Sequence, residues 1–406
     1  MQDIFQDYVG LLQYMTIPLV SGLVGWWTNV MAVKMTFYPI EFVGIRPYLG
    51  WQGIIPSKAK KMGGKAVDLL SQKLLSMEVE FERIDPIRVS EEMKPALEDM
   101  SKKIIDEVMV AQIPDLWEKA PQGMRDAIYE TVAKEMPHLI QQIMDDMKNN
   151  IDQLIDLKTL TVNTLSKDKE LVNQIFFECG RKEFRFIEKS GFYFGALFGL
   201  VQMIVFYFYS PWWMLPLFGV LVGYATNWLA LKLIFEPTQP RKFGPVVVQG
   251  LFLKRQQEVA GEYANIIATK LLTSEAIFEY MVRGPGSKNL AELVKNHVDH
   301  VVDKIAGNAR NLIDLVSGPE KMEVIKSIVF FRFRQELPIS IRSIFKYAED
   351  ALNIRAVLSE RMIALSPEEF ESFLRPAFQE DELTLILVGA LLGCLAGFAQ
   401  YFIFFS

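Results

Sequence analysis

The sequence predicts an all-α membrane protein in which four transmembrane helices form two parallel tandem repeats, each repeat carrying a cytoplasmic helical domain. Three observations lead to this fold class: long apolar runs without a charge, a motif that recurs at constant spacing, and a one-sided distribution of Lys and Arg. The 406 residues suffice for two or three domains, and half of them are hydrophobic. With 43 Lys and Arg and 49 Asp and Glu as well, the charges must be segregated from the apolar runs, and a disordered chain is excluded.

The apolar runs are long enough to cross a bilayer. A span needs about 20 apolar helical residues, and residues 8–33, 190–231 and 383–406 carry no charge. The middle run holds two spans, separated by a turn at 210–213 whose Trp residues are typical of a membrane interface. The predicted spans are residues 14–36, 190–208, 213–235 and 384–405. Buried helices of a soluble protein are the alternative, but they rarely run this long without a charge.

The spans divide the chain into five segments. They are a first transmembrane helix (1–40), a cytoplasmic helical domain (41–189), a hairpin of the second and third transmembrane helices (190–236), a second cytoplasmic helical domain (237–382) and a fourth transmembrane helix (383–406). Apolar residues at steps of three and four over 124–147 and 324–345 predict helices in both domains, and no alternating strand pattern persists.

Basic residues flank the spans on one side. They are Arg46, Lys58, Lys60, Lys61, Arg181, Lys182, Arg185, Lys189, Arg241, Lys242, Lys254 and Arg255. The positive-inside rule then puts both domains in the cytoplasm and both termini on the external, periplasmic side. No cleavable signal peptide is expected, because the N-terminus is acidic and no small-residue cleavage site follows. The net charge of −6 argues against nucleic acid as a partner.

The first and third spans share a motif at an offset of 198 residues, as from Pro18 to Pro216. The matched residues are Gly25, Thr28, Asn29, Ala32, Lys34, Phe37 and Pro39 with Gly223, Thr226, Asn227, Ala230, Lys232, Phe235 and Pro237. Gln52-Gly53 then matches Gln249-Gly250. In the second and fourth spans, Gly191, Gly195, Gly199 and Gln202 match Gly389, Gly393, Gly397 and Gln400. Matched spans cross in the same direction, so the repeats are parallel, about an axis along the membrane normal.

These residues resemble a known family. The pattern Gly-x-x-Thr-Asn-x-x-Ala-x-Lys-x-x-Phe-x-Pro, followed by Gln-Gly and a basic stretch, is similar to the YheB-like bacterial membrane proteins filed as domain of unknown function 445. The resemblance covers nearly the whole chain, although Leu253 stands where the first repeat has Pro56. It implies a protein of the bacterial cytoplasmic membrane, and it implies no activity.

Small residues at four-residue spacing occur in every span and let helices approach closely in lipid. Tight packing is therefore expected of Gly25, Gly191, Gly195, Gly199, Gly223, Gly389, Gly393 and Gly397. Thr28-Asn29 and Thr226-Asn227 add polar groups inside the membrane, where amides must find partners. The two asparagines could bond each other or meet Gln202 and Gln400, either as links between helices or as the lining of a polar site between the repeats.

Pro18 and Pro216 predict kinks in their helices; the alternative is that they act as hinges for alternating access. Lys34 and Lys232 are expected to reach the cytoplasmic headgroups. The basic residues that follow the spans are Lys58, Lys60, Lys61, Lys254 and Arg255. They are either a topological signal or a contact with anionic headgroups, at about 1 kcal/mol each.

No catalytic motif is recognisable, so neither an enzymatic activity nor a cofactor is expected. His297 and His300 share a helix face without an evident third ligand, so no metal is expected. The favoured function is a non-enzymatic membrane scaffold or tether, with the lipid membrane as one partner and a cytoplasmic protein or a second copy of the chain as another. The alternative is a small transporter or lipid-handling protein with a polar site between the repeats. A continuous polar cavity reaching Asn29 and Asn227 would favour that alternative.

Overall fold

The computed structural model describes residues 2–45, 49–307, 319–375 and 382–405, which are mostly helical. They form two compact units, each built from both halves of the chain. Unit 1 comprises Met1–Leu69, Val162–Ile266 and Leu358–Ser406, and unit 2 comprises Leu70–Thr161 and Ile267–Val357. The predicted segments 41–189 and 237–382 therefore each contribute to both units. The domain boundaries drawn from the sequence stay predictions.

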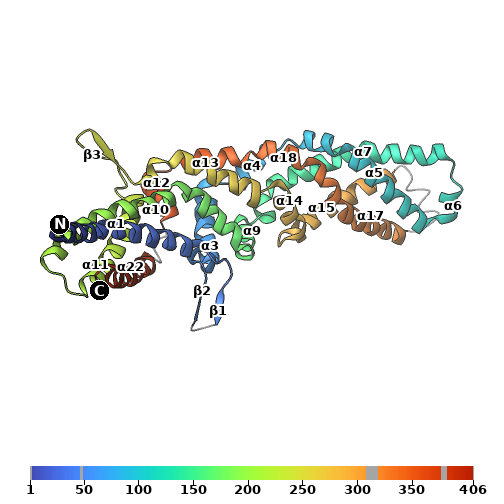
Figure 1. The fold of residues 1–406 in the computed structure, drawn as a ribbon. Helices are drawn as coiled ribbons and strands as arrows, with labels where there is room; N and C mark the ends of the chain where they lie inside the picture. Colours follow the sequence, from blue (N-terminus) through green and yellow to red (C-terminus); the bar gives the residue numbers. More distant parts are fainter. Residues whose placement is uncertain (1, 46–48, 308–318, 376–381, 406) are drawn as a thin grey trace. The chain divides into compact units, whose positions relative to one another are not determined.

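Four helices of unit 1 are long and apolar enough to cross a membrane, as the sequence predicts. They are α1 (Gln2–Phe37), α10 (Lys169–Phe208), α11 (Met214–Phe235) and α22 (Glu382–Phe404). These helices lie alongside one another (Figure 1). Helix α10 begins well before the expected start at residue 190, because the charged residues ahead of the apolar run are also good helix formers. The Asp168 side chain caps this helix by accepting a hydrogen bond of 2.8 Å from the backbone N–H of Leu171.

The two span prolines differ in position. Helix α1 continues through Pro18. Pro216, in contrast, lies in the first turn of α11, where a backbone N–H would have no partner within the helix. A proline there removes no helical hydrogen bond, so the kink expected at Pro216 is not required.

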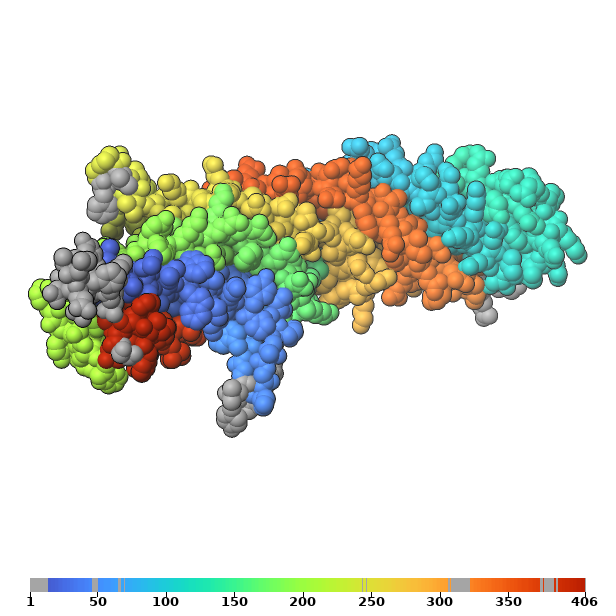
Figure 2. Space-filling view, viewed as in Figure 1, coloured from blue at the N-terminus to red at the C-terminus, as the bar shows by residue number. Residues whose placement is uncertain are grey.

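Two β-hairpins, which the all-α prediction missed, follow the ends of α1 and α11. Strand β1 (Val43–Ile45) pairs antiparallel with β2 (Leu49–Trp51), and β3 (Arg241–Phe243) pairs with β4 (Val246–Val248). Three-residue strands are too short to show the alternation that marks a strand in sequence. Both hairpins stand out from the helices of unit 1, and Figure 2 shows the first as a blue projection.

Shorter helices complete unit 1. They are α2 (Ile54–Ser57), α3 (Ala59–Leu69), α12 (Leu251–Lys254), α13 (Gln256–Ile266) and α20 (Pro367–Leu374), together with most of α9 (Leu157–Lys167) and α19 (Ile354–Ile363). Helices α3 and α13 pack against α10. Helix α20 begins with a capping box, in which Ser366 and Glu369 each bond the other's backbone N–H.

Unit 2 is a helical bundle. Its main helices are α5 (Pro86–Gln112), α7 (Gln122–Asn149), α14 (Ser274–Arg283), α15 (Ser287–Gly307) and α17 (Pro319–Ser340). Its short elements are η1 (Leu70–Leu74), α4 (Met77–Phe81), α6 (Pro114–Glu118), α8 (Ile151–Leu154), η2 (Ile267–Leu271), η3 (Ile341–Ile344) and α18 (Phe345–Leu352). Helix α7 packs against both α5 and α15, and α17 packs against α5. Phe81, Phe278 and Phe345 meet in the core at ring distances of 6.1 Å.

Each half of the chain enters unit 2 through a single π turn. In η1 the N–H of Leu75 donates to the carbonyl of Leu70 at 2.8 Å, and in η2 the N–H of Leu272 donates to Ile267 at 2.7 Å. These bonds reach five residues back rather than four, which widens the helix locally. Unit 2 begins at Leu70 and again at Ile267, so both turns lie at its boundary.

Candidate functional site

The glycines of the spans bring α1 against α10. A Cβ at Gly195 would lie 2.4 Å from the carbonyl oxygen of Ser21, and one at Gly199 would lie 2.7 Å from the Cα of Pro18. Real Cβ atoms essentially never approach closer than 3.0 Å. These positions therefore leave no room for a side chain.

Helices α11 and α22 form an equally close pair. A Cβ at Gly223 would lie 2.2 Å from the carbonyl oxygen of Gly389, and one at Gly393 would lie 2.0 Å from that of Gly219. At Gly397 a Cβ would meet the carbonyl oxygen of Leu215 at 2.4 Å. Close backbone contact thus recurs in both pairs of spans.

Asn29 links the two helices of the first pair. Its Nδ2 donates to the backbone carbonyl of Ile187 on α10 at 2.6 Å, while the Thr28 hydroxyl donates within α1 to the carbonyl of Gly25 at 3.1 Å. Thr28 and Asn29 are fully buried. Asn29 therefore makes none of the bonds expected from the sequence, to Asn227, Gln202 or Gln400.

Asn227 has a matching place in the second pair. It is buried, and its Nδ2 lies 2.3 Å from where a Cβ would stand on Gly389. The Nδ2 of Asn29 lies 2.7 Å from the corresponding point on Gly191. Gly191 and Gly389 thus make room for the asparagines, a role that the sequence did not indicate. Thr226 donates within α11 to the carbonyl of Val222 at 2.8 Å.

The two glutamines differ in their partners. Gln202 accepts a hydrogen bond of 2.9 Å from the Ser21 hydroxyl, and both side chains are buried. At the offset of 198 residues, Gly219 takes the place of Ser21. Gln400 is buried, and within the described part of the chain its Nε2 has no acceptor. The interhelical hydrogen bonds of Asn29 and Gln202 thus both lie within the first helix pair.

The basic residues near the span ends fall into two groups. Exposed side chains belong to Lys34, Lys60, Lys61, Lys232 and Lys254, and Lys58 is half-buried. The Lys232 Nζ lies 4.9 Å from the ring centre of Trp228 and 3.7 Å from a carboxylate oxygen of Glu236. Aromatic and acidic neighbours therefore hold this ammonium beside the end of its helix.

Arg255 belongs to a partly exposed ion-pair network. Its Nη1 bonds buried Glu183 of α10, and its Nε lies 2.8 Å from Glu258, which also pairs with Lys182. Hydrogen bonds from Arg255 and Lys182 lower the pKa of Glu258 to about 2. Burial raises the pKa of Glu183, and Arg255 opposes that shift. Arg255 therefore joins α13 to α10, a role that competes with the predicted contact with headgroups.

The Gln-Gly motif closes the base of the first hairpin. The Gln52 side-chain amide donates to the carbonyl of Ile40 at 2.7 Å, and the Gly53 N–H donates to the carbonyl of Pro39 at 2.8 Å. A Cβ at Gly53 would lie 2.7 Å from the backbone carbon of Phe37, the last residue of α1. The motif thus holds the hairpin base against the end of the span.

The second hairpin is closed in the same way. Gln249 donates from its side-chain amide to the carbonyl of Thr238 at 3.2 Å, and the Gly250 N–H donates to Pro237 at 3.0 Å. Gly250 lies against the backbone of Phe235, where a Cβ would be 2.7 Å from its carbonyl carbon. The recurring motif therefore has a structural role in both halves.

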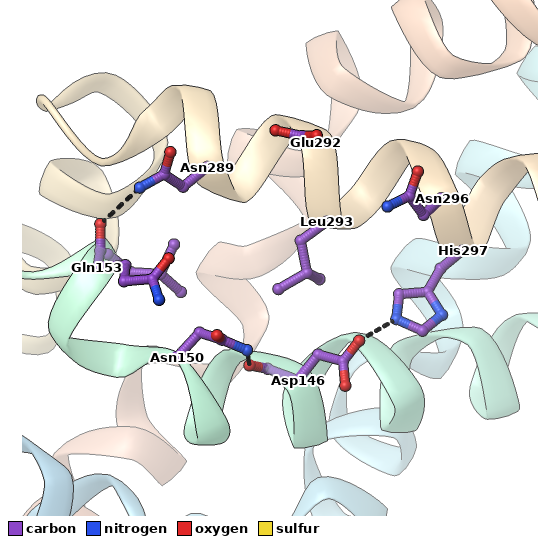
Figure 3. A pocket seen from close by; sticks show the side chains of 9 residues that line it. Asp146, Asn150, Gln153, Asn289, Glu292, Leu293, Asn296 and His297 are labelled. Carbon is purple, nitrogen blue, oxygen red and sulfur yellow. Dashed lines mark hydrogen bonds and ion pairs between the residues drawn. The ribbon is translucent and has the colours of Figure 1, made fainter.

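A polar groove of about 440 Å³ lies within unit 2, between α7, α8 and α15. Its lining residues are Asp146, Asn150, Gln153, Leu154, Asn289, Glu292, Leu293, Asn296 and His297. Figure 3 shows Leu293 pointing from α15 towards Asp146 and Asn150 on the opposite side, whereas Glu292 lies along α15, away from them. The ends are tied by hydrogen bonds, from Asn289 to the carbonyl of Gln153 at 3.2 Å and between His297 and Asp146 at 2.7 Å. This groove offers hydrogen-bonding groups and two carboxylates to a ligand.

His297 contacts Asp146 rather than pairing with His300. Among the residues that the structure describes, no group of three or more His, Cys, Asp or Glu is placed to hold a metal ion. Cys179 is buried and Cys394 is half-buried, and both are free thiols.

The chain is similar to curated bacterial proteins that carry the name UPF0754 membrane protein. The one from Bacillus cereus (strain Q1) is 25% identical over 199 residues, which cover 43% of this chain and 52% of that protein. The one from Nostoc sp. (strain PCC 7120) is 20% identical over 422 aligned positions, which cover 96% of each chain. The one from Bacillus cytotoxicus is 31% identical over 109 residues, 26% of this chain and 27% of that protein. The match to the Bacillus cereus relative thus spans about half of that relative's length.

No family model matches the chain, and no solved structure matches it. The relatives' name and the four apolar helices support a multi-pass membrane protein of an uncharacterised bacterial family. The narrower family, domain of unknown function 445, stays a prediction.

Proposed function

We propose that the chain is a non-enzymatic scaffold of the bacterial cytoplasmic membrane, in which four spans anchor a helical unit that binds a cytoplasmic partner protein. In this proposal the spans belong to two parallel repeats, with both termini external and the helical domains cytoplasmic. The recurrence of the closed hairpin and of the π turn in both halves supports the repeats. The concentration of Lys and Arg beside the span ends supports the orientation.

One observation carries the scaffold role: polar groups are accessible in unit 2 but buried in the spans. Within the spans, Thr28, Asn29, Thr226 and Asn227 are buried between close-packed helices. A transport pathway needs polar groups that a solute can reach. Accessible polar groups instead line the groove of unit 2.

The groove's chemistry suggests the kind of segment that it binds. Asp146 and Glu292 supply negative charge, and the neighbouring carboxamides both donate and accept hydrogen bonds. A partner segment that carries Lys or Arg and presents backbone N–H and C=O groups would satisfy both.

In-cell photocrosslinking tests this proposal. A benzoylphenylalanine at Asn296, which lies exposed at the groove, should give a discrete adduct in the native host. Adding Glu292→Lys should abolish that adduct, because the new charge repels a basic segment. The matched control is the same crosslinker at Leu116, an exposed residue of α6 that does not line the groove.

Two kinds of result would contradict the scaffold role. One is a crosslinking result: either no adduct forms at Asn296, or Glu292→Lys leaves the adduct unchanged. The other is an Asn29→Leu variant that keeps the parent's thermal stability yet loses the protein's cellular role. That second result would favour a transport or lipid-handling protein with a polar site at the asparagines.

A further inference from the structure

Both hairpins expose apolar side chains. In β1, Val43 is 63% and Ile45 is 76% exposed, and in β4 Val247 is 51% exposed. The first hairpin is internally packed, since a Cβ at Gly50 would lie 2.4 Å from the Phe42 ring. Its aliphatic residues nevertheless face outward. Exposed apolar groups gathered on a small projecting element are typical of an interaction surface.

The base of each hairpin is fixed at the end of a membrane span. Helix α1 ends at Phe37, and the Gly53 N–H bonds Pro39 two residues later. A chain extends at most about 3.6 Å per residue, so Ile45 lies within roughly 22 Å of Pro39. In the view of Figure 1, β1 and β2 run across the direction of α1. Since spans cross a bilayer at a modest tilt, strands in this direction would lie along the membrane surface.

Basic side chains accompany the apolar ones. Arg241 and Lys242 are exposed on β3, next to the exposed Val247 of its paired strand. Lys60 and Lys61 are exposed on α3, which follows the first hairpin. Cations beside apolar residues characterise segments that bind the surface of an anionic membrane.

We propose that both hairpins insert Val43, Ile45 and Val247 into the interfacial layer of the leaflet in which α1 and α11 end. Arg241 and Lys242 bind the headgroups of anionic phospholipids there. The bilayer is the occupant because each hairpin is continuous with a span and is closed by the Gln-Gly bonds only a few residues beyond the end of that span. This inference depends on the spans and is independent of the scaffold role.

Fluorescence quenching tests the insertion in the full chain. Cys179→Ala and Cys394→Ala provide a cysteine-free background, to which a single cysteine at Ile45 or Val247 is added and labelled with the fluorophore NBD. The protein is placed in nanodiscs of phosphatidylcholine and phosphatidylglycerol with brominated acyl chains. Emission at both hairpin positions should be blue-shifted and quenched by bromine. The same label at Leu116, exposed in unit 2, should show neither effect.

Charge variants test the headgroup contact. Arg241→Gln with Lys242→Gln should remove the extra quenching at position 247 that phosphatidylglycerol gives over phosphatidylcholine alone. The matched pair Lys94→Gln with Lys102→Gln, exposed on α5, should leave it unchanged. Quenching at the hairpins no greater than at Leu116 would overturn the proposal. So would labels that are shielded from water but not quenched by bromine, since a protein would then cover the hairpins.

Discussion

The backbones of Gly25 and Gly191 touch: a Cβ on either residue would lie 2.3 Å from the carbonyl oxygen of the other. Contacts of this kind recur along both pairs of spans. In lipid, helices gain little from the hydrophobic effect when they associate, so close backbone approach and buried hydrogen bonds stabilise the pairs instead.

Gly195→Ala should destabilise the protein by roughly 1–3 kcal/mol, the usual cost of overpacking. The new methyl group would lie 2.4 Å from the carbonyl oxygen of Ser21, and the backbone of Ser21 cannot move away unless the two helices shift. Gly261→Ala is the matched control, because this helical glycine has no atom within 4 Å of its Cβ position. That change should be neutral or stabilise by about 0.5–1 kcal/mol. Thermal unfolding in detergent compares them, and equal melting of the two variants would refute the close contact.

Asn29→Leu and Asn227→Leu should each lower stability by about 0.6–2 kcal/mol, the range for an interhelical hydrogen bond in a membrane. The effects should add in the double variant. Asn29 bonds Ile187 within the first helix pair, and Asn227 lies against Gly389 in the second. Residues without shared partners show little coupling. A double-mutant cycle measures this, and a clearly sub-additive result would indicate that the asparagines share one bond.

Gln202→Leu should cost more stability than Gln400→Leu. The first change leaves the buried Ser21 hydroxyl without its acceptor, at a cost of about 1–3 kcal/mol. The second removes an amide whose Nε2 has no acceptor among the described residues, so little is lost. Unfolding of both variants in the same detergent tests the order, and a greater loss from Gln400→Leu would reverse the assignment.

Much of unit 1 could be predicted from sequence, because charge-free runs and glycine spacing report directly on lipid and on close packing. The different surroundings of exposed Lys60 and half-buried Arg255 could not be predicted, since the sequence does not show that Arg255 pairs with the buried Glu183. The hairpins were not predicted because their strands, at three residues each, are too short to show an alternating pattern. The groove of unit 2 joins Asp146 to His297, which lie 151 residues apart, and no local pattern reports such a contact.

Acid should weaken the ion-pair network around Glu258. Its pKa is lowered to about 2 by Arg255 and Lys182, so its carboxylate stabilises the fold above the ordinary pKa of the unfolded chain. That contribution is lost as the pH falls from about 4.5 towards 2. Glu258→Gln should therefore lose less stability than the parent between pH 6 and pH 3. Because Glu258 is 42% exposed, the difference should be modest and should shrink in high salt. Identical pH profiles would contradict this role.

Labelling of single cysteines can establish the orientation of the spans. If the positive-inside distribution of Lys and Arg sets the topology, the turn between α10 and α11 faces outward, whereas the residues after α1 and those of α15 face the cytoplasm. Ser210, Ser57 and Ser287 report on these three places. Each is replaced by cysteine in turn, in a background that lacks Cys179 and Cys394, and intact cells are treated with an impermeant maleimide. Ser210→Cys should be labelled at once, whereas Ser57→Cys and Ser287→Cys should react only after the membrane is permeabilised. If Ser57→Cys or Ser287→Cys is labelled in intact cells while position 210 is protected, the topology is the opposite of the one proposed. The hairpins and the groove would then face the periplasm, and neither a cytoplasmic partner nor cytoplasmic headgroups could be their ligand.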